Sequence, residues 1–471
     1  MTDRFESPLA TRYASQRMIS LFSQDNRYRT WRKLWAVLAR TEMELGLPIT
    51  EEQVEELFAH TDDIDYEAVS QREKEVRHDV MAHVWAYGQA APSAAGIIHL
   101  GATSCYVTDN ADLIIYRDAL SLVREELTEL MKCLYSFADR YKDVPVLGYT
   151  HYQPAQPVTV GKRASLWLQD VFEDLKETEQ VIEGMKFLGS RGATGTEASY
   201  MELFDGDGRK IDEMNRRIAD SFGFSECYPV CGQTYPRKLD SRILNALSSV
   251  AQSCYKMAQD IRLLQHDRQL EEPFGDEQIG SSAMAYKRNP MRCERICSLS
   301  RYLMTLPADA AMTASTQFLE RTLDDSAGRR IAIPEAFLCA DAVLRLACNV
   351  VSGLNVNEKV TDRTLREYLP FMATENILME GVKRGGDRQE LHEHIRRLSM
   401  EAVRARNEGE EFDLLGSITD DSIFNMTREE LAGVLEPALY VGRSSDQVTA
   451  FLEKVRPIIN TDTDVDYDIE V

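Results

Sequence analysis

Three long stretches of the chain repeat apolar residues at alternating steps of three and four, and this repeat limits the possible folds more than any other feature. Such steps place the apolar side chains in one line along a helix, so each stretch predicts a helix with a buried seam. Each helix would run about 25 residues or more, roughly 40 Å at 1.5 Å per residue. Strand patterning is nearly absent. The seams consist of Leu113, Tyr116, Leu120, Val123, Leu127, Leu130, Leu134 and Phe137; of Ala164, Leu168, Val171, Leu175, Thr178, Ile182 and Met185; and of Ile243, Leu247, Val250, Cys254, Met257, Ile261 and Leu264.

The seams predict an all-α protein in which the long helices form a bundle. We expect three helical domains, 1–103, 104–356 and 357–471, because a glycine-containing segment precedes the first seam and the helical segments shorten after about residue 355. The central domain would be the long-helix bundle. The seams are more apolar than one chain covers easily, which favours a homotetramer with this bundle as its core. A coiled-coil rod is the alternative, but polar loops separate the predicted helices.

Composition narrows the class of protein further. The net charge of −23 disfavours nucleic acid and anionic membranes as partners, so an anionic small substrate would need a local cluster of basic side chains. The nine cysteines lack regular spacing, and the chain shows neither a signal region nor an apolar run of about 18 residues, which predicts a cytoplasmic protein with reduced thiols. Cys227 and Cys231 have no second pair nearby, so no metal site is predicted. The acidic residues 461–471 predict a solvated tail.

Residues 280–290 read Gly-Ser-Ser-Ala-Met-Ala-Tyr-Lys-Arg-Asn-Pro and predict a long exposed loop. Loops of this length often bind ligands or act as lids, although a solvated polar linker is the plainer alternative. Serine is a poor base unless its alkoxide is stabilised. Backbone N–H groups after Gly280 and the ammonium of Lys287 could both lower the pKa of Ser281.

This run resembles the signature loop of the fumarase/aspartase superfamily, Gly-Ser-Ser-x-Met-Pro-x-Lys-x-Asn-Pro, with Ala285 in place of the proline. The resemblance implies a β-elimination that releases fumarate without a metal or an organic cofactor. It implies that Ser281 is the base, while Lys287 and Asn289 hold the substrate carboxylates. Glu294 matches the carboxylate partner of the catalytic histidine in that superfamily.

A second motif, Thr-His-Tyr-Gln at residues 150–153, lies between the first two seams. Alone, these residues favour a structural cap near a helix start. The superfamily has a Thr-His-x-Gln motif at this point, which implies that His151 is the acid that protonates the leaving group, oriented by Glu294. In the superfamily the loop serine and this histidine reach each site from different subunits, and the resemblance implies the same for Ser281 and His151.

Three further runs are similar to the adenylosuccinate lyases of animals within this superfamily: Arg-His-Asp at 77–79, Gly-Gln-Thr-Tyr at 232–235, and Glu-Arg-Thr-Leu-Asp-Asp-Ser at 320–326. The last run, with the arginines that follow it, implies a phosphate site, since guanidinium groups and hydroxyls suit phosphate. A salt-bridged helix surface is the alternative. Thr103 and Ser104 either bind a carboxylate or cap the following helix. The implied substrate-binding residues are Arg12, Tyr13, Arg77, His78, Asp79, Thr103, Ser104, Gln233, Asn289, Arg295, Arg321, Ser326 and Arg330.

The resemblance as a whole implies an enzyme that splits adenylosuccinate into AMP and fumarate, and the succinylated aminoimidazole carboxamide ribotide of purine biosynthesis likewise. Another fumarate-releasing lyase is one alternative, although those substrates carry no phosphate. A non-catalytic structural protein on the same scaffold is the other, and the loss of Ser281 or His151 would favour it. His83 lies five residues after His78, a spacing that does not share a helical face, so we predict a structural role for it.

Overall fold

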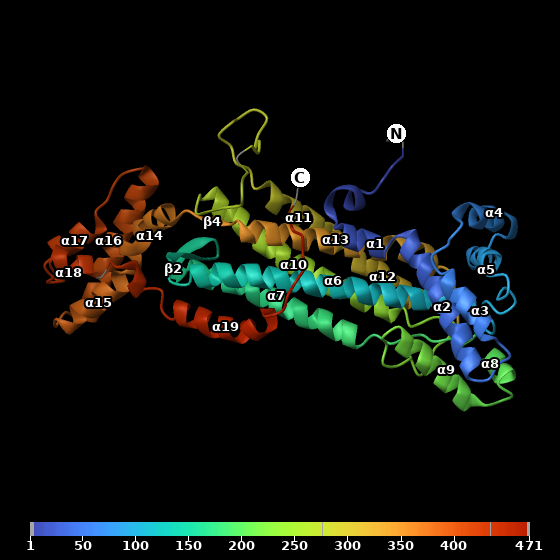
Figure 1. Ribbon diagram of the computed structural model, residues 1–471. Coiled ribbons are helices and arrows are strands. Elements are labelled where there is room, and N and C mark those ends of the chain that lie inside the picture. Colours follow the sequence, from blue (N-terminus) through green and yellow to red (C-terminus); the bar gives the residue numbers. More distant parts are fainter. Residues whose placement is uncertain (1–3, 276, 434, 469–471) are drawn as a thin grey trace.

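The protein is built almost entirely from helices, as a computed structural model describes it over residues 4–275, 277–433 and 435–468. The predicted all-α fold class is confirmed. The three seams lie on α6 (Ser104–Arg140), α7 (Val160–Glu183) and α10 (Lys238–His266), which run side by side along the molecule (Figure 1). The longest helix, α6, has 37 residues and therefore spans about 55 Å.

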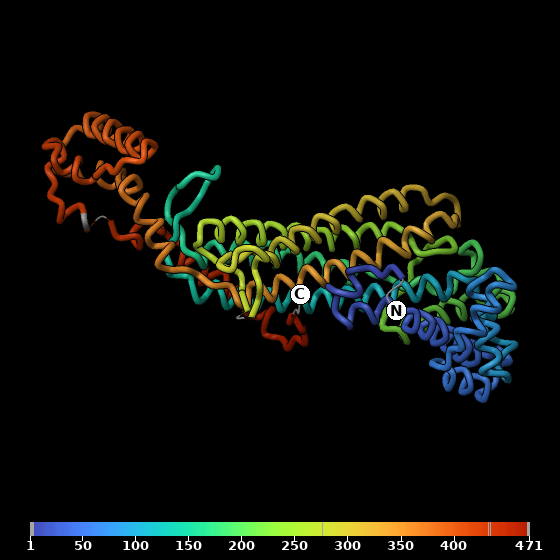
Figure 2. Tube along the Cα trace, turned by 90° about the horizontal axis from the view of Figure 1, so that it is seen from above, coloured from blue at the N-terminus to red at the C-terminus, as the bar shows by residue number. Residues whose placement is uncertain are grey.

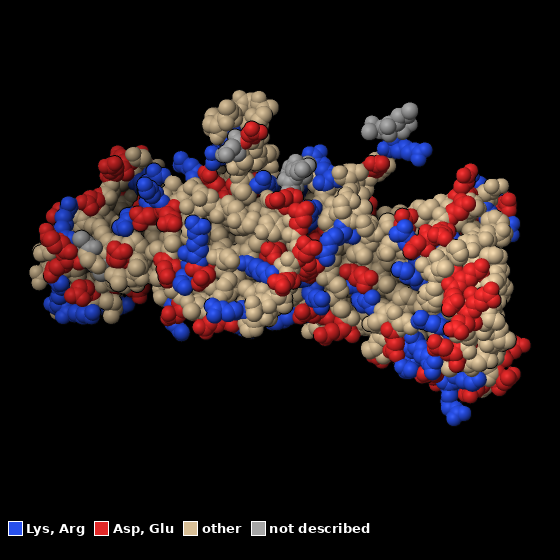
Figure 3. All heavy atoms as spheres, in the orientation of Figure 1, with Lys and Arg blue, Asp and Glu red and all other residues tan. Residues whose placement is uncertain are grey.

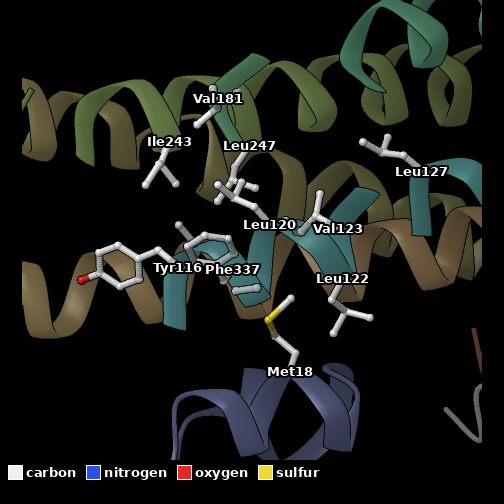
Figure 4. Close-up of a cluster of buried hydrophobic side chains, with 14 of the residues drawn as sticks. Met18, Tyr116, Leu120, Leu122, Val123, Leu127, Val181, Ile243, Leu247 and Phe337 are labelled. Atoms are coloured by element: carbon white, nitrogen blue, oxygen red, sulfur yellow. The ribbon is translucent and has the colours of Figure 1, made fainter. Parts of the chain in front are cut away.

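The seam side chains are buried within the single chain. Every seam residue of α6 and α10 is buried, and on the second seam only Ile182 is half-buried. Leu120, Leu247 and Phe337 converge in this core, and Met18 points toward them from α1 (Gln16–Leu21) (Figure 4). The expectation that one chain cannot cover the seams is therefore wrong, and any case for a tetramer must rest on other observations.

A fourth long helix, α13 (Asp325–Ser352), completes the bundle, and the apolar spacing does not predict it. Residues 336–344 of this helix are buried without interruption. A helix that is buried on most sides shows no single seam. Pro334 inside the helix hides it further, because proline normally ends a helical pattern.

Three of the four long helices run in the same direction. Arg329 near the beginning of α13 bonds Asp112 of α6 and Asp240 of α10, whereas α7 runs the other way. Near the far end, β3 (Leu270–Glu271) pairs with β4 (Asn355–Val356) and ties the end of α10 to the end of α13. The beginnings of α6, α10 and α13 therefore meet at one end of the bundle and their ends meet at the other (Figures 1 and 2).

The N-terminal helices gather at the end of the bundle where α6 begins (Figure 2). His83 is buried there against Tyr28 and Trp31, and burial lowers its pKa to about 4. The structural role predicted for His83 is thus confirmed. The N-terminal elements are η1 (Leu9–Tyr13), α1, α2 (Gln24–Glu44), α3 (Glu51–Ala59), α4 (Tyr66–Val76) and α5 (Asp79–Ala90).

Shorter elements connect the long helices. An antiparallel hairpin links α6 to α7, and two helices between α10 and α13 extend the bundle (Figure 1). No helix among the described residues is long and apolar enough to cross a membrane. The connecting elements are β1 (Pro145–Thr150), β2 (Gln153–Thr159), α8 (Ala198–Leu203), α9 (Gly208–Ser221), α11 (Met291–Leu303) and α12 (Leu306–Thr316).

The C-terminal third consists of two parts. Its first helices have a hydrophobic core separate from that of the bundle, at the hairpin end (Figure 2). The last helix, α19 (Ser444–Ile459), returns along α6 and α7, where Val448, Leu452 and Val455 join the bundle core. The predicted domain 357–471 is thus not one packed unit. Its other elements are α14 (Glu358–Met372), α15 (Thr374–Lys383), α16 (Arg388–Glu408), α17 (Leu414–Asp420), α18 (Arg428–Gly433) and η2 (Pro437–Leu439).

The acidic segment after α19 lies along the bundle where the structure describes it, up to residue 468, although the side chains of 461, 462, 464, 466 and 468 are exposed as predicted. Its backbone carbonyl groups accept hydrogen bonds from the bundle: Asp464 from Arg17, and Tyr467 from Asn349. The carboxylates that suggested a solvated tail are not the groups that make these bonds, because neutral peptide groups carry the attachment.

Candidate active site

A cavity of about 470 Å³ lies at the end of the bundle where α6, α10 and α13 begin. This volume falls within the range of roughly 300–1,000 Å³ that is common for small-molecule sites. Residues from five separate parts of the sequence line it, including all three runs that resemble adenylosuccinate lyases. The predicted residues that it brings together are Arg77, His78, Asp79, Ser104, Gln233, Arg321, Ser326 and Arg330.

Helix beginnings surround this cavity. Asp79, Ser104 and Ser326 lie in the first turns of α5, α6 and α13. Thr103 occupies the cap position of α6, but its side chain makes no capping hydrogen bond, and neither does Asp324 before α13. Side-chain capping by Thr103 is therefore wrong. First-turn amides without a side-chain cap, together with the positive end of the helix dipole, favour an anion.

A buried ion network holds the beginnings of α6, α10 and α13 together. Arg237 donates to Asp109 of α6 at 2.8 Å and to Asp325 of α13 at 2.7 Å, and Arg321 donates to Asp325 at 2.9 Å. Burial opposes the ionisation of Asp325, but the charge of Arg237 and the hydrogen bonds from Arg321 and Arg237 outweigh it, so the pKa of Asp325 lies below its usual value. The network fixes the position of Arg321 at the cavity wall.

Arg329 extends the network to the third helix. It donates to Asp240 of α10 at 2.6 Å and to Asp112 of α6 at 3.1 Å, and it bonds the buried hydroxyl of Tyr235. Sequence reasoning missed Arg237, Asp109 and Asp240 as a network. Their partners lie about ninety or more positions away, so no local pattern indicates them, and only the density of arginines in 320–330 gave a signal.

The arginines of this run form ion pairs, as the salt-bridge alternative expected, but the pairs border the cavity. Arg330 is 55% exposed and lies 3.3 Å from Asp79, which is itself one of the predicted nucleotide-pocket residues. Arg321 is only 23% exposed. An arginine that is half-exposed and held by one long ion pair can exchange that partner for a phosphate at small cost.

The Gly-Gln-Thr-Tyr run lies directly against the arginine run. The Gln233 N–H donates to the Glu320 carbonyl at 3.0 Å, and a Cβ on Gly232 would lie 2.5 Å from that same oxygen, so the approach requires glycine. The Gln233 amide accepts from the Cys105 thiol at 3.4 Å and donates to the Ala193 carbonyl at 3.1 Å. Its orientation at the cavity wall is therefore set by both ends of the amide.

His78 has a defined tautomer. Its Nδ1 accepts a hydrogen bond from the Met81 N–H at 3.3 Å, where the ring caps α5. In the neutral ring the proton then lies on Nε2. His78 consequently offers a donor to a ligand in the cavity.

Three predicted substrate-binding residues form a second group outside the cavity. Tyr13 ends η1, and the guanidinium of Arg295 lies 5.6 Å from the centre of its ring. The guanidinium of Arg12 lies 6.0 Å from the centre of the same ring. The first turn of α11, which carries Arg295, therefore meets the N-terminal segment, although the two are far apart in sequence.

The signature loop projects from the bundle between β3 and α11 (Figure 1). Its base is fixed by Glu272, a buried carboxylate that accepts from the N–H groups of Arg292 and Cys293 at the start of α11. Asn289 brings the two ends of segment 280–289 together, because its side-chain amide donates to the Gly280 carbonyl at 2.8 Å. Asn289 thus has a role within the loop, beside the carboxylate contact predicted for it.

Ser281 directly follows Gly280 in this segment. Its Oγ accepts hydrogen bonds from the N–H groups of Ala283 at 3.3 Å and Met284 at 3.1 Å. Two backbone donors on one hydroxyl oxygen stabilise its alkoxide, as the sequence suggested for a serine after Gly280. Lys287 is exposed on the same loop.

Ala285 occupies a position in the loop that suits proline. The Lys287 N–H donates to the Met284 carbonyl at 3.0 Å, which makes Ala285 the second residue of a β-turn. Proline is favoured there because its φ of about −65° matches the turn. We expect Ala285→Pro to raise the free energy of unfolding by about 0.4–1 kcal/mol, measured by denaturant titration. A large loss of stability would mean that the loop backbone differs from this turn.

His151 stands at the tip of the β1–β2 hairpin and not at a helix start, so the structural-cap alternative is wrong. His151 and Tyr152 have φ values of 51° and 63° and form a two-residue turn. Both angles are unfavourable for residues with a Cβ, and backbone strain of this kind is concentrated at functional sites. The side chain of His151 is exposed at the tip of the hairpin, where a ligand or another molecule could contact it.

The pair predicted between His151 and Glu294 does not form within the chain. Glu294 lies in the first turn of α11, 4.0 Å from Arg262, and its side chain is 53% exposed. The hairpin and the signature loop project from different faces of the bundle (Figures 1 and 2). Both are separated from the cavity by the length of α10, whose 29 residues span about 40 Å. One chain therefore presents the predicted site residues in four separate groups: the cavity, the group around Tyr13, the signature loop and the hairpin tip.

Comparison with known proteins agrees with this architecture. The family described as "Lyase" matches residues 12–304, and the family "Adenylosuccinate lyase C-terminus" matches residues 370–451. The solved structure of 3-carboxy-cis,cis-muconate lactonizing enzyme from Pseudomonas putida shares the fold, with a TM-score of 0.83 over 95% of this chain and 99% of that chain at 22% identity. A fumarate lyase from Mesorhizobium sp. BNC1 has a TM-score of 0.80 over 94% and 98% of the two chains at 23% identity. Fold and family together define a lyase.

Relatives at higher identity define the family more closely. The adenylosuccinate lyase of Saccharomyces cerevisiae is 51% identical over 96% of this chain and 95% of its own length. The enzymes of the same name from Schizosaccharomyces pombe and Schistosoma mansoni are 50% and 44% identical, over 96% and 98% of this chain and 94% and 96% of their own lengths. The chain belongs to the adenylosuccinate lyase family.

Proposed function

We propose that this protein cleaves adenylosuccinate to AMP and fumarate. It would also cleave the succinylated aminoimidazole carboxamide ribotide to aminoimidazole carboxamide ribotide and fumarate. One observation carries the proposal: Arg321, Ser326 and Arg330 border a cavity onto which the beginnings of three helices open. Guanidinium groups, a hydroxyl and first-turn amides together suit a nucleotide monophosphate. Fumarate-releasing lyases whose substrates lack phosphate have no need of such a site.

The proposed chemistry is a β-elimination. The Ser281 alkoxide removes the proton from the carbon beside a substrate carboxylate, and the electron pair of that C–H bond becomes the carbon–carbon double bond of fumarate. The bond to nitrogen breaks, and His151 gives a proton to the leaving nitrogen. Lys287 and Asn289 hold the carboxylates, which stabilises the negative charge that develops during proton removal. All of these groups come from side chains.

We further propose that each site is assembled from several subunits of a homotetramer. The cavity and the signature loop lie at opposite ends of the long helices, so subunits packed in opposite directions would bring the loop of one beside the cavity of another. The loop exposes Ile279, Met284 and Tyr286 at 78%, 49% and 84%, and it carries few charges (Figure 3). Exposed apolar residues on a projecting loop favour insertion into a partner.

The outer face of the bundle supports the same assembly. Leu323, which lines the cavity, Met312 on α12 and Ile331 on α13 are all more than 60% exposed. Glu294, exposed on α11, would meet a His151 from another subunit and would orient its imidazole. The proposal also places the protein in the cytoplasm, where its nine free cysteines would stay reduced.

An absorbance assay with purified protein tests the proposed function. Adenylosuccinate should be cleaved, whereas its nucleoside form without the phosphate should require a far higher concentration. Equal use of the two would place the phosphate outside the site and favour another fumarate-releasing lyase. No cleavage of either would favour a structural protein on this scaffold.

Arg330→Ala tests the phosphate site. Since Arg330 is half-exposed, its loss should change the melting temperature little, but KM for adenylosuccinate should rise about tenfold or more, as expected when a charge-assisted hydrogen bond of roughly 1.5–3 kcal/mol is removed. Arg366→Ala is a matched control, because Arg366 is 53% exposed and pairs with Asp362 on α14, away from the cavity. Normal AMP binding by Arg330→Ala, measured by calorimetry, would assign this arginine to a surface ion pair only.

A further inference from the structure

The N-terminal segment that carries Arg12 and Tyr13 is attached to the middle of α13. The buried carboxylate of Asp341 accepts from the Ser15 N–H at 2.6 Å and from the Ser15 hydroxyl at 2.5 Å. One turn further along α13, Arg345 donates to the Tyr13 carbonyl at 3.2 Å. These contacts fix the backbone on both sides of Ala14, directly after the two predicted substrate-binding residues.

Asp341 lies beside a second buried carboxyl group, Glu126 on α6. Burial, and next the charge of Asp341, raise the pKa of Glu126 on α6 well above its usual value, so Glu126 keeps its proton. A protonated Glu126 can donate a hydrogen bond to Asp341, which also accepts from Ser15. The Ser15 attachment therefore does not depend on the C-terminal tail.

Arg345 joins this segment to the C-terminal tail, residues 460–468. Its Nε donates to the Asp466 carbonyl at 2.6 Å and one terminal nitrogen donates to the Asp468 carbonyl at 3.4 Å, while the other terminal nitrogen reaches Tyr13. The guanidinium is only 12% exposed. Arg17 on α1 makes a second link, because it donates to the Asp464 carbonyl at 2.5 Å. The two ends of the chain thus meet at one planar side chain.

We propose that Arg345 is a positioning residue for the nucleotide site and that the C-terminal tail is the strap that orients it. The inference rests on the proposed function, since Arg12 and Tyr13 are proposed nucleotide contacts. A guanidinium has its donors in one rigid plane, so the two tail carbonyls fix the direction in which the remaining nitrogen points. Without the tail, Arg345 regains rotamer freedom and Tyr13 loses its fixed backbone.

The position of Tyr13 matters because its ring lies against Arg295. A shift of the Tyr13 backbone moves the ring that Arg12 and Arg295 approach. Both arginines belong to the proposed nucleotide site. A positioning role therefore predicts weaker nucleotide binding with little change in the chemical step. A merely structural tail predicts that melting temperature, kcat and KM all change together.

The test compares four variants: deletion of residues 460–471, deletion of 469–471 only, Arg345→Gln and Arg345→Lys. We expect the longer deletion and Arg345→Gln to raise KM for adenylosuccinate about tenfold with kcat within about twofold, a change equal to one charge-assisted hydrogen bond. The shorter deletion retains residues 464, 466 and 468, whose carbonyl groups accept from Arg17 and Arg345, and should leave KM unchanged. Arg345→Lys keeps the charge without the planar donors and should give an intermediate KM. An unchanged KM in the longer deletion would overturn the proposal.

Amide hydrogen exchange gives a second measurement that does not depend on activity. The longer deletion should increase exchange over residues 9–14 at least fivefold, whereas the Ser15 amide, bonded to Asp341, should stay protected. Unchanged exchange over 9–14 would also overturn the proposal. A wild-type protein that fails to cleave adenylosuccinate would remove the proposed function, but the exchange result would still decide whether the tail holds the N-terminal segment.

Discussion

Replacing Ser281 with alanine is expected to lower the turnover of adenylosuccinate at least a hundredfold, about the low end of what a general base contributes. Folding and substrate binding should remain, because the loop that carries Ser281 lies outside the bundle core and is anchored at its base by Glu272 and Asn289. The hydroxyl that is lost accepts the N–H groups of Ala283 and Met284 and does not hold the base of the loop. Steady-state kinetics and a thermal melt measure the two effects.

Ser282→Ala provides the matched control. Ser282 is the next residue of the same exposed loop. The hydroxyl that accepts from the Ala283 and Met284 N–H groups is that of Ser281. Its replacement should leave kcat within a few-fold of wild type. If Ser281→Ala keeps near-normal turnover, or if both serines matter equally, the base must be sought elsewhere in the loop.

The bundle could be predicted from the sequence because burial along α6, α7 and α10 follows one face of each helix. A seam records which side of a helix is covered, and the side chains of the first and third seams are all buried. It does not record what covers it. The cover comes from α13 and α1 of the same chain, and α13 has no seam because it is buried on most sides.

The hairpin that carries His151 could not be predicted from local signals. Its tip has no glycine or asparagine, the residues that normally supply two positive φ angles. Its second strand contains Pro154 and Pro157, and proline normally argues against a strand. The resemblance of the motif located a functional residue here, whereas the backbone reason for its exposure became visible only in the structure.

The cavity shows the complementary case. The side chains that face a ligand occur in short runs that resemblance can recognise, such as the one containing Arg321 and Ser326. The ion network behind them joins Arg237 to Asp109 and Asp325 across three helices. Each of its members is an ordinary charged residue in its local sequence, so only the packing of the helices identifies it.

Mixing two inactive variants is expected to restore activity, and this result would test the assembly and the mechanism together. Ser281→Ala keeps a wild-type His151, and His151→Ala keeps a wild-type Ser281. Within one chain the loop and the hairpin project from different faces, so a single subunit does not bring the two residues together (Figures 1 and 2). If each site takes them from different subunits, some mixed tetramers will contain a complete site.

The expected amount of activity follows from random assembly. With equal amounts of the two variants, the subunit that supplies the serine is wild type at that position in half of the sites. The subunit that supplies the histidine is independently wild type in half, so about a quarter of the sites receive both. Activity should therefore rise from near zero toward about a quarter of the wild-type value as subunits exchange.

Exchange itself must be shown, for instance by native mass spectrometry of subunits that carry different isotope labels. Each variant incubated alone through the same treatment is the control and should stay inactive. If mixed oligomers form and activity remains at zero, Ser281 and His151 belong to the same chain in each site, and the subunit arrangement proposed here is wrong. Ser281 and His151 would then have to come together within one subunit, which requires a large rearrangement because the loop and the hairpin project from different faces of the bundle (Figures 1 and 2).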